Sequence, residues 1–181
     1  MRIARLLGRL LIGGLFFAHG TQKLFGWFGG PGPDATAQMM EKLNMHPGRR
    51  NAIAAGSAET LGGLGIAFGA LTPAAAAALI ATMITAIRKV HLEKGFFNTA
   101  GGYEFNLSLI AALLLIVEAG PGSPSIDSTL GRDETGSAWA LIALAVGATG
   151  STLAIAASQR ADPKVPDHPL TPEPSATPIN N

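Results

Sequence analysis

The stretch 6–28 constrains the fold of this chain more than any other. It is long enough to cross a bilayer as one helix, which takes about 20 apolar residues, but His19, Gln22 and Lys23 interrupt it before its aromatic end. Residues three or four apart share one face of a helix, so these side chains form one polar stripe. A stripe facing lipid is costly, and we expect it to face other helices or a wet cavity. In the alternative, His19 caps a neighbouring backbone group and Lys23 extends to the lipid head groups.

The composition favours a membrane protein and excludes several functional classes. Of the 181 residues, 48% are hydrophobic and 14% are charged, whereas about 25% of a soluble domain is charged. The absence of cysteine excludes a disulfide, a thiolate metal site and thiol–disulfide chemistry in the chain itself. A formal net charge of +1 without a basic patch among aromatic residues does not support nucleic-acid binding. We expect the first segment to be retained, and not cleaved as a signal peptide, because further apolar segments follow it.

The apolar segments predict an all-α, polytopic membrane helix bundle. Its five spans are 6–27, 51–71, 74–92, 103–119 and 138–157. They divide the chain into a four-helix membrane domain at 1–127, a connector and fifth transmembrane helix at 128–157, and a Pro-rich tail at 158–181 that we expect to be disordered.

Two details of these boundaries follow from helix geometry. The uncharged run 74–87 rises only about 21 Å, at about 1.5 Å per residue. To cross about 30 Å of hydrocarbon the third span must continue to about residue 92, which draws Arg88 to the membrane boundary. A short amphipathic helix at 35–43, with Asp34 at its N-cap, is expected to lie at the membrane interface.

The spans place their unusual polar residues on one side of the membrane. We call the side reached after the first span side A and the opposite side, which holds the N-terminus, side B. His19, Lys23 and Glu59 fall within roughly 6–12 Å of side A, and the polar residues that end the third span and open the fourth lie there too. The candidate ligand-binding residues are therefore His19, Gln22, Lys23, Glu59, Arg88, His91, Glu104 and Asn106.

Glu59 is the most informative member of this set. A carboxylate in hydrocarbon costs a few kcal/mol unless it is paired or protonated, and Lys23 and Arg88 are its expected partners at matching depth. One interpretation is a buried ion pair that fixes helix register without any turnover. The other is a polar cluster that binds a quinone head group or a small anion, or that relays protons.

Six ordered pieces of the sequence resemble the DoxX family. They are HGTQK (19–23), GGPGP (29–33), AETLGGL (58–64), RKVHLEKGFF (88–97), GGYEFNL (101–107) and GPGSPSID (120–127). The resemblance, over about residues 2–127, implies a four-helix module of the bacterial or archaeal inner membrane. Such modules are similar to the small membrane subunit of thiosulfate:quinone oxidoreductases, and are otherwise associated with redox and thiol-stress partners. The fifth span and the tail lie outside the resemblance.

The functional hypotheses therefore share one fold. In the first, the chain is a redox-linked membrane subunit in which Lys23 and Arg88 hold a quinone or anion while Glu59 and His19 exchange protons. No haem pair, flavin motif or metal-ligand spacing is present, so electron transfer would need a partner or a bound quinone. In the second, the chain is a non-catalytic anchor or assembly factor for a soluble redox enzyme. A transporter, which would require a homo-oligomer, is the weakest of the three. The membrane orientation stays open, because basic residues flank the spans on both sides.

Overall fold

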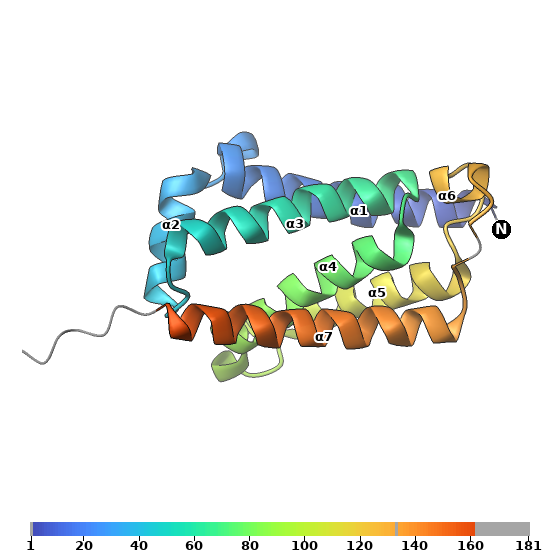
Figure 1. Ribbon diagram of the computed structural model, residues 1–181. Helices are drawn as coiled ribbons and strands as arrows, with labels where there is room; N and C mark the ends of the chain where they lie inside the picture. Colours follow the sequence, from blue (N-terminus) through green and yellow to red (C-terminus); the bar gives the residue numbers. More distant parts are fainter. Residues whose placement is uncertain (1, 133, 162–181) are drawn as a thin grey trace, which may run out of the picture.

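A computed structural model describes residues 2–132 and 134–161 of the chain, without the side chain of Arg2. Its five long helices lie side by side in a bundle (Figure 1). They are α1 (Arg2–Phe25), α3 (Gly48–Phe68), α4 (Thr72–Ala86), α5 (Glu104–Ala119) and α7 (Ser137–Arg160). No strand occurs within the described ranges. The prediction of an all-α membrane helix bundle is confirmed.

Three stretches of helix are long and apolar enough to cross a membrane, namely Ile3–Phe25, Thr72–Lys94 and Ser137–Arg160. α5 has 16 residues and so rises about 24 Å, while α3 is a continuous helix whose apolar sequence is interrupted by the buried Glu59. Both nevertheless run alongside the three long helices in the bundle (Figure 1). That α3 and α5 also cross the bilayer stays a prediction.

The third span continues past Ile87, as its length required. After α4 the chain forms η2 (Ile87–His91), a turn of π-helix, and then η3 (Leu92–Lys94). Together with α4 these turns complete an apolar stretch of 23 residues. Arg88 and Lys89 therefore belong to a stretch long and apolar enough to span a membrane, and lie near its side-A end.

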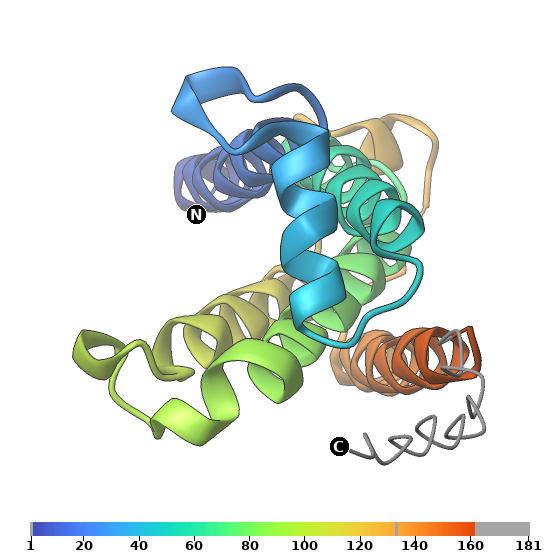
Figure 2. The same cartoon turned by 90° about the vertical axis from the view of Figure 1, so that its left-hand side faces the viewer.

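The bundle has two layers. Figure 2 shows α1 beside α3 in one layer and α4, α5 and α7 in the other, with α2 (Gly32–Lys42) crossing the side-A end. The core between α4, α5 and α7 contains the fully buried Leu79, Ile80 and Leu113, and Phe16 of α1 and Ile66 of α3 extend it to the other layer. Since α7 buries residues in this core, the fifth helix is an integral part of the bundle.

Small residues let α1 and α3 approach each other closely. A Cβ atom added to Gly13 would lie 2.5 Å from the carbonyl oxygen of Gly63, and one added to Gly20 would lie 2.5 Å from the backbone nitrogen of Thr60. The second layer uses the same device, because a Cβ on Gly147 of α7 would lie 2.6 Å from a methyl carbon of Ile80. Glycine at these positions allows the close backbone contacts that hold helices together in lipid.

Two sequence-based boundaries are wrong. α2 begins at Gly32, two residues before the predicted cap Asp34, because Pro33 in the first turn has the backbone angle that a helix start needs. Asp34 lies inside that first turn and forms an ion pair with Arg49 over 3.2 Å. Residues 158–160, predicted to open the disordered tail, are helical, since α7 continues to Arg160 and Ser158 is buried in it. The rest of that tail, 162–181, lies outside the described residues.

Candidate functional site

The centre of the candidate site is an ion pair between α1 and α3. Lys23 Nζ donates a hydrogen bond to Glu59 Oε2. The Glu59 side chain is 5% exposed and that of Lys23 is 21% exposed, so the carboxylate is enclosed while the ammonium keeps an accessible edge. The partner predicted for Glu59 on α1 is thus the one the structure provides. This pair lies about three turns along α3 from the side-A start of that helix at Gly48, next to the close contact at Gly20 and Gly56.

The other two residues of the α1 stripe have different surroundings. His19 is exposed and has no hydrogen bond or ion pair within the described part of the chain. It precedes Gly20, which is buried against α3, and a helix turns about 100° per residue. His19 therefore points away from α3. Gln22 is half-buried and packs against the turn after α1, where a Cβ on Gly30 would lie 2.6 Å from its Cα.

Arg88 faces α7. Its side chain is exposed, and Nη1 donates a hydrogen bond to Thr152 Oγ1 at 3.2 Å. One turn earlier on the same helix, Thr85 Oγ1 donates to Ser151 Oγ at 2.9 Å. These contacts form a polar seam between α4 and α7, so the hydrogen bond of Arg88 goes to the fifth helix and its predicted pairing with Glu59 is not made.

The remaining three candidates form hydrogen bonds at the side-A end of the bundle, in or near the loop that joins α4 to α5. His91 Nδ1 forms a hydrogen bond with the carbonyl oxygen of Gly101 at 2.7 Å. Glu104 Oε2 accepts a hydrogen bond from the backbone nitrogen of Asn98 at 2.9 Å. Asn106 is buried, and its Nδ2 donates to the sulfur of Met83 at 3.5 Å. Each of these side chains has a separate local partner.

Of the eight candidates, therefore, the structure joins Lys23 and Glu59 directly, and gives the others different surroundings. Two cavities of about 420 and 540 Å³ open on the surface of the bundle. Neither is lined by any of the eight residues. In chemical terms the side-A residues form an interhelical ion pair with one accessible edge.

A second polar group, at side B, was not predicted from the sequence. Asp127 Oδ1 accepts a hydrogen bond from the backbone nitrogen of Leu71 at 2.8 Å, and Oδ2 accepts from Thr72 N at 3.0 Å and Thr72 Oγ1 at 2.7 Å. Burial raises the pKa of Asp127, but these hydrogen bonds from Thr72 and Leu71 outweigh it and hold the pKa below its ordinary value. Asp127 lies in the short helix α6 (Ile126–Thr129) and caps the start of α4.

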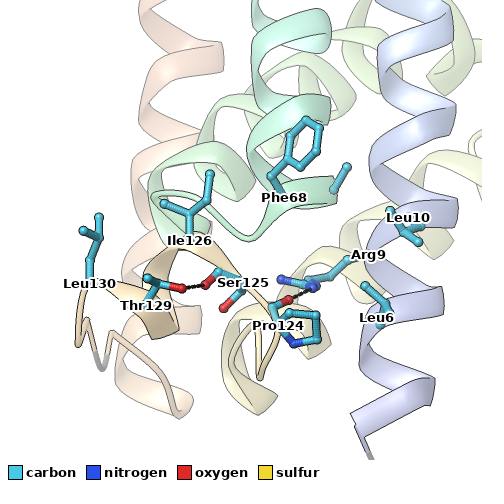
Figure 3. A pocket seen from close by; sticks show the side chains of 10 residues that line it. Leu6, Arg9, Leu10, Phe68, Pro124, Ser125, Ile126, Thr129 and Leu130 are labelled. Atoms are coloured by element: carbon cyan, nitrogen blue, oxygen red, sulfur yellow. Dashed lines mark hydrogen bonds between the residues drawn. The ribbon is translucent and has the colours of Figure 1, made fainter.

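Arg9 belongs to the same end of the bundle. Although it is charged, Arg9 is only 2% exposed, about one turn inside the first apolar stretch. Its Nη2 donates to the carbonyl oxygen of Pro124 at 2.6 Å. Figure 3 shows the side chain reaching from α1 toward Pro124 and Ser125, below Phe68. The signal that could have found it was an arginine one turn inside the first apolar stretch.

The DoxX family model matches residues 4–92. This segment, just under half of the chain, is of the DoxX type. Searches of curated proteins and of solved structures gave no match. The DoxX segment contains Arg9, Lys23, Glu59 and Arg88 and ends just after η2. The last part of the sequence resemblance, 93–127, lies beyond the matched residues.

Polar contacts tie the DoxX segment to the rest of the chain at both ends of the bundle. At side A, His91 forms a hydrogen bond with Gly101, and Arg88 donates one to Thr152. At side B, Asp127 caps the helix that begins at Thr72. α5, α6 and α7 are therefore bound to the DoxX segment by specific hydrogen bonds as well as by the apolar core.

Proposed function

We propose that this DoxX-type membrane protein is a non-catalytic subunit that anchors a soluble redox enzyme at side A. The match of residues 4–92 to the DoxX family model and three helices able to cross a membrane support the membrane part of this proposal. The redox link rests on the resemblance to membrane subunits of redox assemblies. The anchoring role rests on the polar side-A residues that form their hydrogen bonds within the chain itself.

The closed Lys23–Glu59 pair is the observation that carries the proposal. A carboxylate that exchanges protons with a substrate has to reach it, but Glu59 is enclosed between α1 and α3 with Lys23 as its partner. Neither described cavity includes either residue. A buried charge with a close partner suits a link that fixes the register of two helices. Arg88 and His91 likewise direct their hydrogen bonds to the chain itself.

The side-A end of the bundle also presents a polar surface to a partner, and hydrogen bonds fix the position of α2 there. α2 lies across it (Figure 2), and Glu41 at the end of α2 accepts hydrogen bonds from His46 and from the backbone nitrogen of Gly48 at the start of α3. These bonds lower the pKa of Glu41, so the carboxylate stays charged at neutral pH. Exposed Phe96 and Phe97 project from the α4–α5 loop at the same end.

Single-cysteine crosslinking tests the anchor directly. The natural chain has no cysteine, so one introduced thiol gives one reactive position. Ala35→Cys places it on the exposed part of α2 at side A, and Ser128→Cys places a matched exposed thiol on α6 at side B. In native membranes we expect Ala35→Cys to capture a protein that carries a flavin or another redox cofactor, and Ser128→Cys not to. Capture from side B alone, or from neither position, contradicts the proposal.

One observation favours quinone binding as a second candidate. The Lys23 ammonium keeps an accessible edge, and exposed Phe25 and Trp27 follow it with ring centroids 5.3 Å apart. A quinone ring could stack there while its carbonyl accepts a hydrogen bond from Lys23. Solvent extraction of the purified protein distinguishes the two functions. Quinone retained by the natural chain and lost from Glu59→Gln supports quinone binding and contradicts a purely structural ion pair, whereas absence from both supports the anchor.

A further inference from the structure

Arg9 is a buried cation with an incomplete set of partners. Nη2 donates to Pro124, but Nε and Nη1 are buried and have no hydrogen-bond acceptor within the described residues. Nη1 lies against Gly69, where any side chain would collide with it. A buried charged donor without an acceptor is strongly unfavourable, so its presence needs a reason.

Asp127 does not supply the missing hydrogen-bond acceptor for Arg9. Asp127 attracts Arg9 electrostatically, but no ion pair joins them in the part of the chain that the structure describes. Both carboxylate oxygens of Asp127 already accept hydrogen bonds from Leu71 and Thr72. The positive charge of Arg9 is therefore only partly balanced by the protein.

Arg9 lines the cavity of about 420 Å³ at side B. The other walls are mainly apolar and come from three separate parts of the chain: Leu6 and Leu10 from α1, Phe68 from α3, and Ile126 and Leu130 from the connector (Figure 3). Leu10, Phe68 and Leu130 are also exposed on the outer surface of the bundle. The cavity thus joins a cationic wall to an exposed apolar surface.

The cavity lies at the side-B end of the bundle, where we expect the lipid head groups of that side. Arg9 lies about 10 Å along α1 from its first residue, at about 1.5 Å per residue, which is near the membrane boundary on side B. Arg5 is a second, exposed cation at the same end of the bundle, where its Cδ lies 3.1 Å from where a Cβ of Gly122 would be, but it does not line the cavity. Charges attract each other more strongly where the dielectric constant is low, so an anion in this mainly apolar cavity interacts with Arg9 across the cavity wall.

We propose that this cavity binds the anionic head group of a membrane phospholipid, with Arg9 balancing the phosphate charge and the apolar wall of Leu10 and Phe68 contacting the acyl chain. An amphiphile fits both halves of the site, whereas a free anion would leave the apolar walls without a partner. The site is independent of the Lys23–Glu59 pair and of any partner at side A.

Lipid retention by the full-length protein tests this site. The protein is purified in dodecyl maltoside, washed free of lipid and titrated with phosphatidylglycerol, phosphatidylcholine or inorganic phosphate. Native mass spectrometry then counts the bound molecules. We expect the natural chain to retain one phosphatidylglycerol about tenfold more strongly than phosphatidylcholine, which is about 1.4 kcal/mol. Arg9→Gln should lose this preference. Equal retention of both lipids by the natural chain overturns the proposal.

A pair of neighbouring substitutions keeps the test decisive if Arg9→Gln does not fold. Leu10→Trp fills the cavity, and Leu11→Trp places the same bulk on an exposed position of α1 that does not line it. We expect Leu10→Trp to abolish the preference for phosphatidylglycerol and Leu11→Trp to keep it. An unchanged preference in Leu10→Trp refutes the site. Displacement of phosphatidylglycerol by an equal concentration of inorganic phosphate would show an anion site without lipid specificity, and would refute the lipid assignment.

Discussion

Lys23→Met is the substitution that best tests the role of the α1–α3 ion pair. It removes the partner of Glu59, whose side chain is 5% exposed and so cannot recover its lost interaction from water. Breaking a buried ion pair by removing one partner costs about 3–5 kcal/mol. With roughly 2–4 °C of melting temperature per kcal/mol for a chain of this size, the midpoint of unfolding should fall by roughly 6–20 °C.

The partner substitution should cost less. Glu59→Gln leaves Lys23, whose side chain is 21% exposed and lies in the last turn of α1. Its long side chain can turn toward the membrane boundary and be hydrated there, so the expected cost is about 1–2 kcal/mol. The double variant carries neither charge and should cost little more than Glu59→Gln alone. The coupling energy in this cycle is then nearly the full cost of Lys23→Met, about 3–5 kcal/mol.

Thermal unfolding of the four proteins in one detergent, followed by circular dichroism, measures this cycle. The order expected for the loss of stability is Lys23→Met largest, with the double variant and Glu59→Gln close together. Additive losses, in which the double variant falls by the sum of the two single ones, would mean that Lys23 and Glu59 do not interact. Equal losses in the two single variants would refute the reasoning from their unequal exposure.

Three further predictions follow from other contacts. Gly20→Leu should lower the unfolding temperature by the equivalent of about 1–3 kcal/mol or more, because α3 occupies the space it needs, while Gly14→Leu, with no atom near its Cβ, should not. The folded state lowers the pKa of Asp127, so its carboxylate should stabilise the protein fully above about pH 4 and lose this effect as the pH falls toward the folded-state pKa. A profile of unfolding free energy from about pH 7 to 3 should show this loss in the natural chain and not in Asp127→Asn. Arg88→Met removes one exposed hydrogen bond and should change stability by less than about 1 kcal/mol in the same unfolding assay, so a larger loss would contradict its placement against α7.

Helix positions were predictable from the sequence because hydrophobicity and length both constrain them. The uncharged run ending at Ile87 was too short to span hydrocarbon, and its continuation through η2 and η3 is confirmed. The start of α2 was not predictable from capping preference alone. Asp34 resembles an N-cap, but Pro33 fixes the backbone one residue earlier and starts the helix at Gly32.

The candidate site was predictable in depth but not in direction. Counting residues from the end of a span gives the distance of a side chain from the membrane surface, and this placed Lys23 and Glu59 at the same level. The direction around the helix axis depends on which face packs against which neighbour. His19 differs from the buried Gly20 by one residue and so by about 100°. Arg88 has a suitable depth but faces α7, a helix outside the family resemblance.

Arg9 and Arg5 show why the side-B group could not be found by local pattern. Arg5 precedes the first apolar stretch and Arg9 lies about one turn inside it, and positional rules for membrane helices treat both as boundary cations. Arg5 is exposed, whereas Arg9 is buried because Gly69 leaves room for its guanidinium and the connector passes over it. Its hydrogen bond joins residues 115 positions apart, while the Lys23–Glu59 contact joins residues 36 positions apart. A polar group assembled from α1, the α3–α4 turn and the connector becomes visible only once the helices are packed. The burial of Arg9 therefore depends on the segments that cover it, the α3–α4 turn and the connector, more than on the sequence of α1.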